Sequence, residues 1–533
     1  MLEQQRLGCT PAGSSDATRP ENWRCNAPKG VANISATDYQ FGTIGDVVPQ
    51  ENAGMGSWPG DPSWSIAAVV VPAALLEVEG DAAWVAPAFD DGIMGLLTWF
   101  TALGAAEPSS GGLLPWSELG DWKALDFSNP LIIANLHYLL GALRCADVAS
   151  ALPGRGAEAV ACAALAARVS GALAARFWWA AGPAWDPPSK WSRGGSQAAQ
   201  AMALVLGAGG AALCEPTAAA LLRALNASGG ALTVGATGAL FLLEALAGGA
   251  GRLDLALALA ERPGFPGWVQ EVANATAVPL TAWEEWSPGA LADNSGNSGA
   301  HIFMMGGMTS FVTEHALGLR FAMRVAPAGG AWGTAGHLQR LPGERALRLP
   351  FSLRGRWGLD AAALPAVAAL AAGEGAPRLP QLVQRARALL GRGGGGGGGG
   401  GASASLLPRV AFTVHPHAVA RLQAAAGWRA TPAGNVSLAW RALPARGGVE
   451  VRVAVPVGAL AVLEVGLVEG MAGRAWVDGA PWEGDGWGGE PPLHPCGAGV
   501  ARAAVEGRAH GEEGCAPAVV LVPPSGEHTF LFT

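Results

Sequence analysis

The sequence predicts a mostly helical chain that ends in a small β-domain, and three observations support this prediction. From about residue 63 to 325, apolar residues recur at helical spacing, with irregular loops between the segments. Beyond residue 408 apolar and polar residues alternate, which is typical of strands with one buried face. An uninterrupted run of glycines, residues 393–401, separates the two regions. We therefore expect a toroid of paired helices followed by an antiparallel β-sandwich. A solenoid is the competing arrangement, but the sequence has no fixed-period repeat.

Length and composition narrow the classes of function. A chain of 533 residues is long enough for two or more domains. The net charge is −8 and there is no basic face, so nucleic acid is not expected as a partner. The longest apolar run, residues 66–76, is too short to span a bilayer and contains Pro72, so no membrane span is expected.

The ends of the chain and its cysteines add little about compartment or chemistry. Residues 1–6 have no apolar targeting core, so no signal peptide is visible and the compartment stays undefined. The seven cysteines lack metal-ligand spacing, and no metal or other cofactor is expected. Cys145 and Cys162 lie in helical segments and are interpreted as buried thiols. Cys496 and Cys515 are close enough in sequence to pair, but nothing requires it.

The helical region, residues 1–325, begins with a polar, turn-rich stretch up to about residue 60. Helices are predicted at residues 129–143, 158–179, 196–206, 217–225, 237–246, 253–260 and 301–323. Many of these segments are apolar nearly all round, which indicates that each helix packs on two sides.

The middle and the end of the chain differ from the helical region, and from each other, in composition and residue pattern. Residues 326–407 mix proline, glycine and arginine around one predicted helix at 379–390, and are interpreted as an insertion or linker. Polyglycine at 393–401 cannot offset its backbone entropy by burial, so it is expected to be a flexible tether. Strands of the terminal domain, residues 408–533, are predicted at 410–414, 436–440, 449–455, 459–465, 476–479 and 529–532.

A cluster of tryptophans and carboxylates near residue 284 suggests a sugar site. Trp283, Glu284, Glu285 and Trp286 are consecutive, and a polar loop and then His301 follow. The apolar face of a sugar stacks on indole rings, and a carboxylate can orient hydroxyls or activate water. A simpler interpretation also fits, because tryptophans at i and i+3 share a helix face and could be core residues between solvated glutamates.

Two further clusters favour the sugar site over that simpler interpretation. Residues 58–64 read Trp-Pro-Gly-Asp-Pro-Ser-Trp, and residues 116–122 read Trp-Ser-Glu-Leu-Gly-Asp-Trp. Each lies next to a predicted helix, in the loop position where a helical toroid presents its binding site. Three such clusters in separate loops are harder to explain as core tryptophans than one.

These motifs resemble, in order, those of the α-L-rhamnosidase family of glycoside hydrolases. The matching pieces are Gly45-Asp46-Val47-Val48-Pro49 with Asp61-Pro62-Ser63-Trp64, Gly120-Asp121-Trp122, Ser196-Gln197-Ala198-Ala199-Gln200, residues 232–238, Pro266-Gly267-Trp268, residues 282–286 and Ser298-Gly299-Ala300-His301. The terminal domain, with residues 475–479 and 526–530, resembles the domain that follows the family's barrel. No single motif is specific to the family, but seven motifs in the family's order are strong evidence for it.

The resemblance implies an (α/α)6 barrel and inverting hydrolysis of terminal α-L-rhamnose. Glu284 matches the general base of the family, and His301 matches the motif histidine, which would bond a sugar hydroxyl or Glu284. The expected substrate-binding residues are Asp61, Trp64, Asp121, Trp122, Trp283 and Trp286, and the expected partner is a rhamnose-containing glycoside or polysaccharide. Another (α/α)6 sugar hydrolase or phosphorylase is the alternative within this fold.

Two departures from the family pattern bear on activity. Ala300 replaces the asparagine before the motif histidine. The family's acid motif, similar to "DCPxRxERxGWxGD", is absent upstream of residue 45, and residues 1–5 resemble the helix that follows it. The resemblance therefore implies a barrel that is incomplete at its amino terminus and lacks its general acid. Glu51 as a substitute acid and a carbohydrate-binding protein without catalysis are the alternatives.

Overall fold

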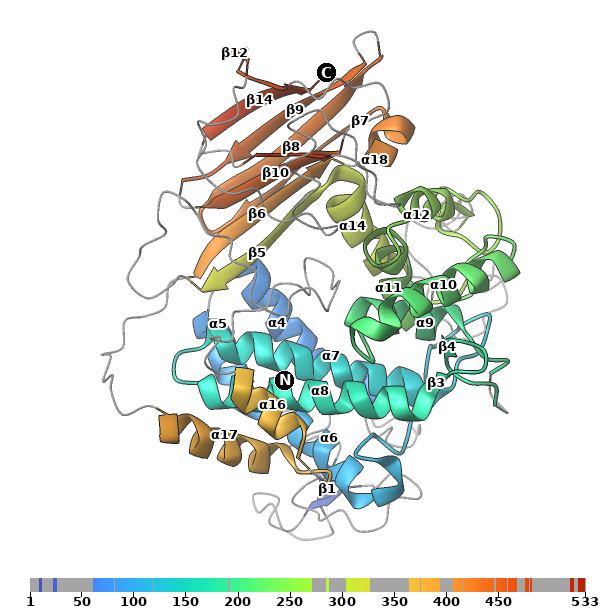
Figure 1. The fold of residues 1–533 in the computed structure, drawn as a ribbon, viewed down its shortest axis with the longest axis vertical. Helices are drawn as coiled ribbons and strands as arrows, with labels where there is room; N and C mark the ends of the chain where they lie inside the picture. The colour runs from blue at the N-terminus through green and yellow to red at the C-terminus, as the bar shows by residue number, and fades with distance from the viewer. Residues whose placement is uncertain are drawn as a thin grey trace.

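A helical region and a sheet region make up the computed structural model of the chain, as Figure 1 shows. The structure describes residues 9–11, 23–25, 61–80, 82–117, 119–189, 192–270, 284–286, 303–325, 364–373, 375–393, 406–414, 416–444, 447–457, 459–466, 475–478, 480–481, 518–521 and 526–532.

The helices form a row of hairpins. An inner row contacts in succession, α4 with α7, α7 with α9, α9 with α11 and α11 with α14, and each outer helix packs on an inner one. The inner helices are α3 (Pro62–Ser65), α4 (Ala67–Glu79), α7 (Pro130–Ala151), α9 (Gln197–Leu206), α11 (Ala236–Glu244) and α14 (Phe303–Phe311). The outer helices are α6 (Gly95–Ala106), α8 (Gly156–Phe177), α10 (Ala211–Ala227) and α12 (Leu253–Ala260). The predicted pairing of helices is confirmed, whereas closure into a full toroid stays a prediction.

Short elements connect or extend these helices. They are α5 (Ala82–Ala88), the π-helices η2 (Phe89–Met94), η4 (Ala245–Gly249) and η5 (Val312–Leu317), and the 3-10 helix η3 (Pro108–Ser110). Two small antiparallel pairs are formed by β1 (Cys9–Pro11) with β2 (Trp23–Cys25) and by β3 (Trp178–Trp179) with β4 (Ala184–Trp185).

Polar caps define where the inner helices begin. Asp61, Asn129 and Ser196 are the N-caps of α3, α7 and α9, and each side-chain oxygen accepts a hydrogen bond from a backbone N–H of the first turn. Pro130 follows its cap directly, where its missing N–H costs nothing. Because each outer helix returns the chain, successive inner helices begin at the same end of the row. The loops that carry the predicted site therefore gather at that end.

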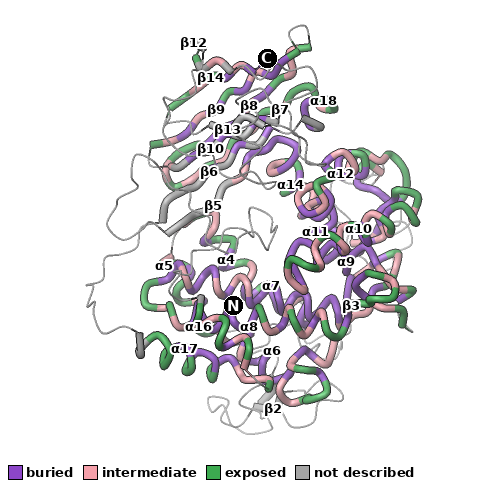
Figure 2. The backbone as a smooth tube through the Cα atoms, in the orientation of Figure 1, coloured by how far each residue is buried: buried purple, intermediate pink, exposed green. Residues whose placement is uncertain are grey.

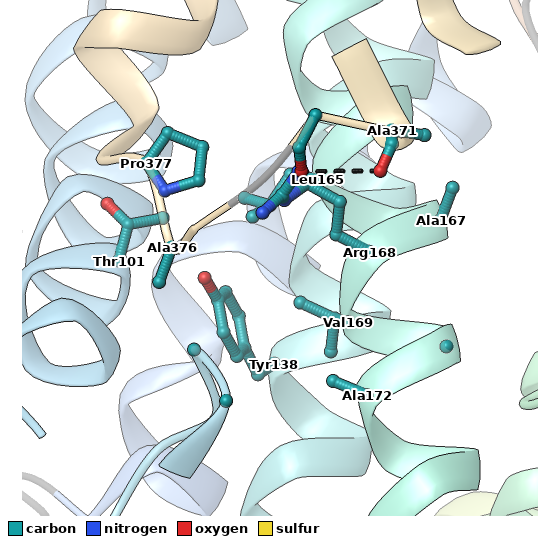
Figure 3. A pocket seen from close by; sticks show the side chains of 14 residues that line it. Thr101, Tyr138, Leu165, Ala167, Arg168, Val169, Ala172, Ala371, Ala376 and Pro377 are labelled. Atoms are coloured by element: carbon teal, nitrogen blue, oxygen red, sulfur yellow. Dashed lines mark hydrogen bonds between the residues drawn. The ribbon is translucent and has the colours of Figure 1, made fainter. Parts of the chain in front are cut away.

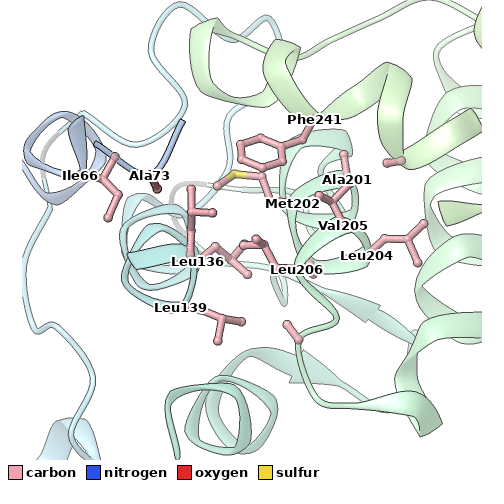
Figure 4. Close-up of a cluster of buried hydrophobic side chains, with 14 of the residues drawn as sticks. Ile66, Ala73, Leu136, Leu139, Ala201, Met202, Leu204, Val205, Leu206 and Phe241 are labelled. Carbon is pink, nitrogen blue, oxygen red and sulfur yellow. The ribbon is translucent and has the colours of Figure 1, made fainter. Parts of the chain in front are cut away.

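Apolar packing between the inner helices explains why they are apolar nearly all round. Leu136 of α7, Met202 and Leu206 of α9 and Phe241 of α11 meet in one buried cluster (Figure 4). In Figure 2 the buried residues follow the contacts between helices, and exposed residues lie on the outside. The interior is dense, because a Cβ added to Gly141 of α7 would lie 2.8 Å from Ile66 Cδ1.

Among the residues that the structure describes, length and composition alone would allow three helical stretches to cross a membrane, Pro62–Glu79, Pro130–Ala151 and Gly156–Phe177. Within the structure, 78% of the apolar window of Pro130–Ala151 is buried by other parts of the protein. The apolarity of α7 is therefore accounted for by helix packing.

A disulfide joins α7 to α8, which corrects the interpretation of Cys145 and Cys162 as free buried thiols. The two sulfur atoms are bonded, with the Cα atoms 5.8 Å apart and both residues fully buried. The helical spacing placed each cysteine on a buried face correctly. It could not show that the two faces meet, because that depends on how the hairpin packs.

Charged residues gather at the C-terminal ends of the inner helices. His315 of η5 is bonded to Glu244 at the end of α11, and Nη2 of Arg320 lies 2.6 Å from His315 Nδ1. Burial raises the pKa of the neighbouring Glu314 to about 7; Arg320 and Arg429 oppose this shift, while Glu244 and Glu77 add to it.

The described part of residues 326–407 contains two packed helices where the sequence predicted one within a linker. They are α16 (Leu364–Ala371) and α17 (Leu379–Gly393), and both contact α8. Leu379, Leu382 and Ala386 form the buried face of α17. Arg168 of α8 donates to carbonyls at the end of α16, including that of Gly373 at 2.5 Å. This part of the predicted linker is therefore integrated with the helical region.

In the part of the C-terminal region that the structure describes, the strands form two sheets. The six-stranded sheet has the order β12-β11-β14-β9-β8-β7 and is antiparallel throughout; the four-stranded sheet has the order β13-β10-β6-β5 and pairs β6 with β10 in parallel. The strands are β5 (Leu319–Val325), β6 (Leu406–Val414), β7 (Ala424–Thr431), β8 (Gly434–Leu443), β9 (Gly448–Val455), β10 (Leu460–Gly466), β11 (Ala475–Val477), β12 (Ala480–Pro481), β13 (Ala518–Leu521) and β14 (Gly526–Phe532), with α18 (Pro416–Leu422) between β6 and β7. A stacked sandwich stays a prediction, although β6 contacts β8.

The predicted helix at 301–323 is wrong at its end. The helical part stops at Leu317, Gly318 follows with φ 89°, and residues 319–325 pair with β6. Gly318 supplies the left-handed conformation that ends a helix. After it, large apolar residues alternate with arginine or alanine, and the available edge of β6 decides that they form a strand.

Candidate active site

Three loops at the N-terminal ends of the inner helices form the candidate site. They are residues 117 and 119–123 before α7, residues 233–238 at the start of α11 and residues 284–286. Each of these loops is joined to both of the others by hydrogen bonds, and the first and third also by an ion pair. The joined side chains and backbone groups are separated by 52 to 162 residues along the chain.

Asp61 anchors the first of these loops. Its side chain is 1% exposed, and Oδ1 accepts hydrogen bonds from the backbone and the hydroxyl of Ser63 at 2.9 and 2.7 Å. Oδ2 accepts from the Ser117 hydroxyl at 3.0 Å and from the backbone N–H of Leu119 at 3.2 Å. Asp61 thus ties the start of α3, and with it the half-buried Trp64, to the loop that precedes Trp122.

Asp121 anchors the second loop. It is 6% exposed; Oδ1 accepts from the Thr237 hydroxyl and from Gly238 N, both at 2.8 Å, and Oδ2 accepts from Gly235 N at 2.7 Å. Burial raises the pKa of Asp121, and the three donors oppose that shift. The carboxylate caps α11 from another part of the chain.

Gly235 allows this close contact. Its N–H donates to Asp121 as above, and the adjacent Ala236 N–H donates to the Trp122 carbonyl at 2.8 Å. A Cβ at Gly235 would lie 2.1 Å from that carbonyl oxygen. Only a glycine therefore lets residues 121–122 and 235–236 lie side by side.

Two side-chain contacts join residues 122–123 to the paired glutamates. Nε1 of Trp122 donates to Oε1 of Glu284 at 3.0 Å, and Nζ of Lys123 lies 3.0 Å from Oε2 of Glu285. The Lys123 ammonium also lies 5.3 Å from the centre of the Trp122 ring. Trp122 and both glutamates are half-buried, so the carboxylates are held without being removed from solvent.

Trp286, which directly follows the two glutamates in the chain, joins their segment to the start of α11. Its Nε1 donates to the Val234 carbonyl at 2.6 Å, and its ring packs edge-on against Trp268 at 5.4 Å between centres. The side chain is 1% exposed. An indole buried to this extent has no open face for a sugar, so its contacts are those of a support for Glu284.

The structure brings together five of the eight residues proposed from the sequence, through the contacts above and the loops they join: Asp61, Asp121, Trp122, Glu284 and Trp286. Trp64 follows from Asp61 on α3, whereas Trp283 and His301 lie outside the described residues. Lys123 and Gly235 also belong to the site, although they were not among the residues predicted from the sequence. Lys123 carried a signal, because it directly follows Trp122 and is one of only three lysines among 34 basic residues.

A separate cavity of about 260 Å³ lies under the turn between α16 and α17 (Figure 3). Tyr138, Arg168 and Thr101 contribute its polar groups, and Leu165, Val169 and Pro377 are among its apolar walls. None of its lining residues belongs to the three loops of the candidate site. Among the described residues, no group of three or more histidine, cysteine or acidic side chains could hold a metal ion.

Comparisons with known proteins agree with this arrangement of helices and loops. Residues 26–316 match the family of the bacterial alpha-L-rhamnosidase 6 hairpin glycosidase domain. No match was found among curated proteins.

Two solved structures have a similar fold. The alpha-L-rhamnosidase from Dictyoglumus thermophilum is 16% identical, with a TM-score of 0.60, over 92% of this chain and 42% of that chain. The alpha-L-rhamnosidase from Streptomyces avermitilis, solved in complex with L-rhamnose, is 19% identical, with a TM-score of 0.55, over 92% of this chain and 35% of that chain. The chain thus spans about two-fifths or less of the length of these proteins.

Proposed function

The chain belongs to the bacterial α-L-rhamnosidase six-hairpin glycosidase family, and from that premise we propose that it acts on terminal α-L-rhamnose with Glu284 as the general base. The substrate is a rhamnose-containing glycoside or polysaccharide, and the anomeric configuration is inverted. The observation that carries the proposal is the hydrogen bond from Trp122 to Glu284, which aims one carboxylate at the meeting point of three loops.

The chemistry needs an oriented carboxylate. In an inverting reaction a general base removes a proton from water while the water attacks the anomeric carbon from the face opposite the leaving group. An ionised carboxylate accepts about four hydrogen bonds, so the bond from Trp122 fixes Oε1 of Glu284 and still allows a water to be bound. We assign sugar stacking to Trp64, Trp122 and Trp283, and a hydroxyl contact to His301.

The buried residues of the site are assigned to positioning. Asp61 and Asp121 use both carboxylate oxygens to hold loops, and Trp286 uses its indole N–H to hold Val234. Their removal is therefore expected to disorder the loops that bear Trp122 and Glu284.

We propose that the general acid of the family has no counterpart among the printed residues. The acid motif of the family is absent from the printed residues, and positioned acid–base catalysis commonly contributes about 10²–10⁴-fold. We expect slow hydrolysis by this chain, with a smaller loss on nitrophenyl rhamnoside than on alkyl rhamnosides. A nitrophenolate leaves without protonation, whereas an alkoxide does not.

The test compares wild type, Glu284→Gln and the matched control Glu261→Gln, whose residue is an exposed surface carboxylate paired with Arg421. With 4-nitrophenyl α-L-rhamnoside we expect β-L-rhamnose as the first product, seen by proton NMR before mutarotation, and a loss of turnover in Glu284→Gln alone. A first product of the α configuration, or unchanged turnover in Glu284→Gln, would refute the assignment of the base.

The missing acid motif favours one second candidate, a carbohydrate-binding protein without catalysis. L-Rhamnose would then bind and quench tryptophan fluorescence, no turnover would be detected on either substrate, and Glu284→Gln would leave the affinity unchanged. Stabilisation against heat by a sugar other than L-rhamnose would instead point to another glycosidase specificity.

A further inference from the structure

We propose that Lys123 is a positioning residue. Its ion pair with Glu285 keeps this carboxylate from competing for the indole N–H of Trp122, so that Glu284 alone is oriented as the general base. The inference rests on the proposed function, since it concerns the same pair of carboxylates. It adds a residue and a selection step that the sequence motifs do not specify.

Two parallel side-chain contacts join residues 122 and 123 to residues 284 and 285. Trp122 meets Glu284 through its indole N–H at 3.0 Å, and Lys123 meets Glu285 through its ammonium at 3.0 Å. Neighbouring residues of one loop thus bind neighbouring residues of the other. Side-chain exposure is 25% for Lys123 and 22% for Glu285, so solvent screens this ion pair less than a pair on the open surface.

The backbone of Lys123 supports a specific role. Its φ is 62°, a left-handed conformation that non-glycine residues rarely adopt. The Asp121 carbonyl accepts a hydrogen bond from Ala124 N at 3.1 Å, and the Trp122 carbonyl accepts from Ala236 N, so the turn is fixed on both sides of the residue. Such conformations persist where the surroundings determine them, and they cluster at functional sites. In this turn the side chain emerges beside the Trp122 ring.

Electrostatics explains how the ion pair between Lys123 and Glu285 determines which glutamate binds the indole N–H of Trp122. Two adjacent carboxylates compete for the same donors; among the described residues, Trp122 donates its indole N–H to Glu284 and the ammonium of Lys123 pairs with Glu285. The ammonium takes Glu285, which leaves the indole N–H to Glu284. Without Lys123, Glu285 would carry an uncompensated charge beside Trp122 and would compete for the indole N–H. The orientation of Glu284 would then no longer be unique.

The experiment is a double-mutant cycle read at the indole of Trp122. Protein labelled with ¹⁵N-tryptophan gives one Nε1–H resonance for each ordered indole, and Trp122→Phe identifies that of Trp122. We expect Lys123→Met and Glu285→Gln each to shift or broaden this resonance, because each leaves one charge unpaired. The Lys123→Met/Glu285→Gln double variant removes both charges and should restore the wild-type position. Lys123→Arg retains the charge and should stay close to wild type.

Rates give the second readout. With 4-nitrophenyl α-L-rhamnoside, Lys123→Met should lose about 10- to 100-fold in kcat with little change in KM, as expected for a misoriented catalytic group. The double variant should recover most of this loss. A merely structural role for Lys123 would predict additive losses, with the double variant worse than either single variant.

The outcomes separate this inference from the proposed function. An unchanged Trp122 resonance in Lys123→Met, or no recovery in the double variant, overturns the role of Lys123 whatever the protein hydrolyses. If the cycle behaves as expected while wild type neither binds L-rhamnose nor cleaves the rhamnoside, the proposed function fails and the positioning of Glu284 by Lys123 stands. Should Lys123→Met fail to fold, Glu285→Gln and Lys123→Arg still decide between these outcomes.

Discussion

Replacing Asp121 with alanine removes the acceptor of three hydrogen bonds that hold the start of α11. The donors are two backbone N–H groups, of Gly235 and Gly238, and the hydroxyl of Thr237, at 2.7 to 2.8 Å. A hydrogen bond to a charged group contributes about 1.5–3 kcal/mol, and the loss of a helix cap costs about 0.5–2 kcal/mol. The three bonds share one carboxylate, so the losses do not add fully, and we expect the variant to lose about 3–5 kcal/mol of stability.

Asp121→Asn should lose less, about 1–3 kcal/mol. The amide oxygen can still accept two of the hydrogen bonds, but its NH₂ group would face the N–H of Gly235. The matched control is Asp254→Asn at the start of α12, where the aspartate pairs with Arg252 on the exposed surface; we expect it to cost at most about 1 kcal/mol.

Urea unfolding followed by tryptophan fluorescence measures these differences. The midpoint should fall in the order Asp254→Asn, Asp121→Asn, Asp121→Ala, with the slope m unchanged. A loss below about 0.5 kcal/mol for Asp121→Ala, or equal losses for Asp121→Asn and Asp254→Asn, would show that the three hydrogen bonds do not hold the loop.

Three further predictions follow from other parts of the structure. Because the pKa of Glu314 is raised from 4.5 to about 7 in the folded state, the free energy of unfolding should fall as the pH rises from about 4.5 to 7. Glu314→Gln should remove this fall and should be more stable than wild type by up to about 3 kcal/mol at pH 8. Urea unfolding at a series of pH values measures both effects. An unchanged pH profile would contradict this. Reduction of the disulfide between Cys145 and Cys162, which are 17 residues apart, should cost about 2–3 kcal/mol, and the double alanine variant should no longer respond to reductant. With Glu284→Ala and 4-nitrophenyl α-L-rhamnoside, added azide should restore release of nitrophenol and give β-L-rhamnosyl azide; failure of azide to restore release, or an α-configured azide, would count against a base on the face opposite the leaving group.

Local features of the sequence decided most of the helices. The caps at Asp61, Asn129 and Ser196 and the glycine after α9 depend on residues within one helical turn, so their signals survive without knowledge of the fold. The alternation in β8 and β9 is likewise local, and Val436, Leu438 and Trp440 are buried as the pattern predicts. The order of the motifs was enough to predict the family.

Features that depend on contact with a distant segment of the chain could not be predicted from the local sequence. Residues 319–325 form a strand because β6 offers them an edge, and residues 364–371 form a helix that packs on α8. Cys145 and Cys162 are bonded because two helical faces meet. In each case the residues allow more than one structure, and a distant segment selects one.

The sequence alone also determined which residue types the candidate site contains, because tryptophans and carboxylates clustered in loops are visible in one dimension. Only the tertiary structure showed which groups each of these residues contacts. Asp121 and Asp61, expected to touch sugar, have both oxygens engaged by loops, and Glu284 is distinguished from Glu285 by a residue 162 positions away. A carboxylate acts as base or as anchor according to the donors around it, and those donors come from segments that only the folded chain brings together.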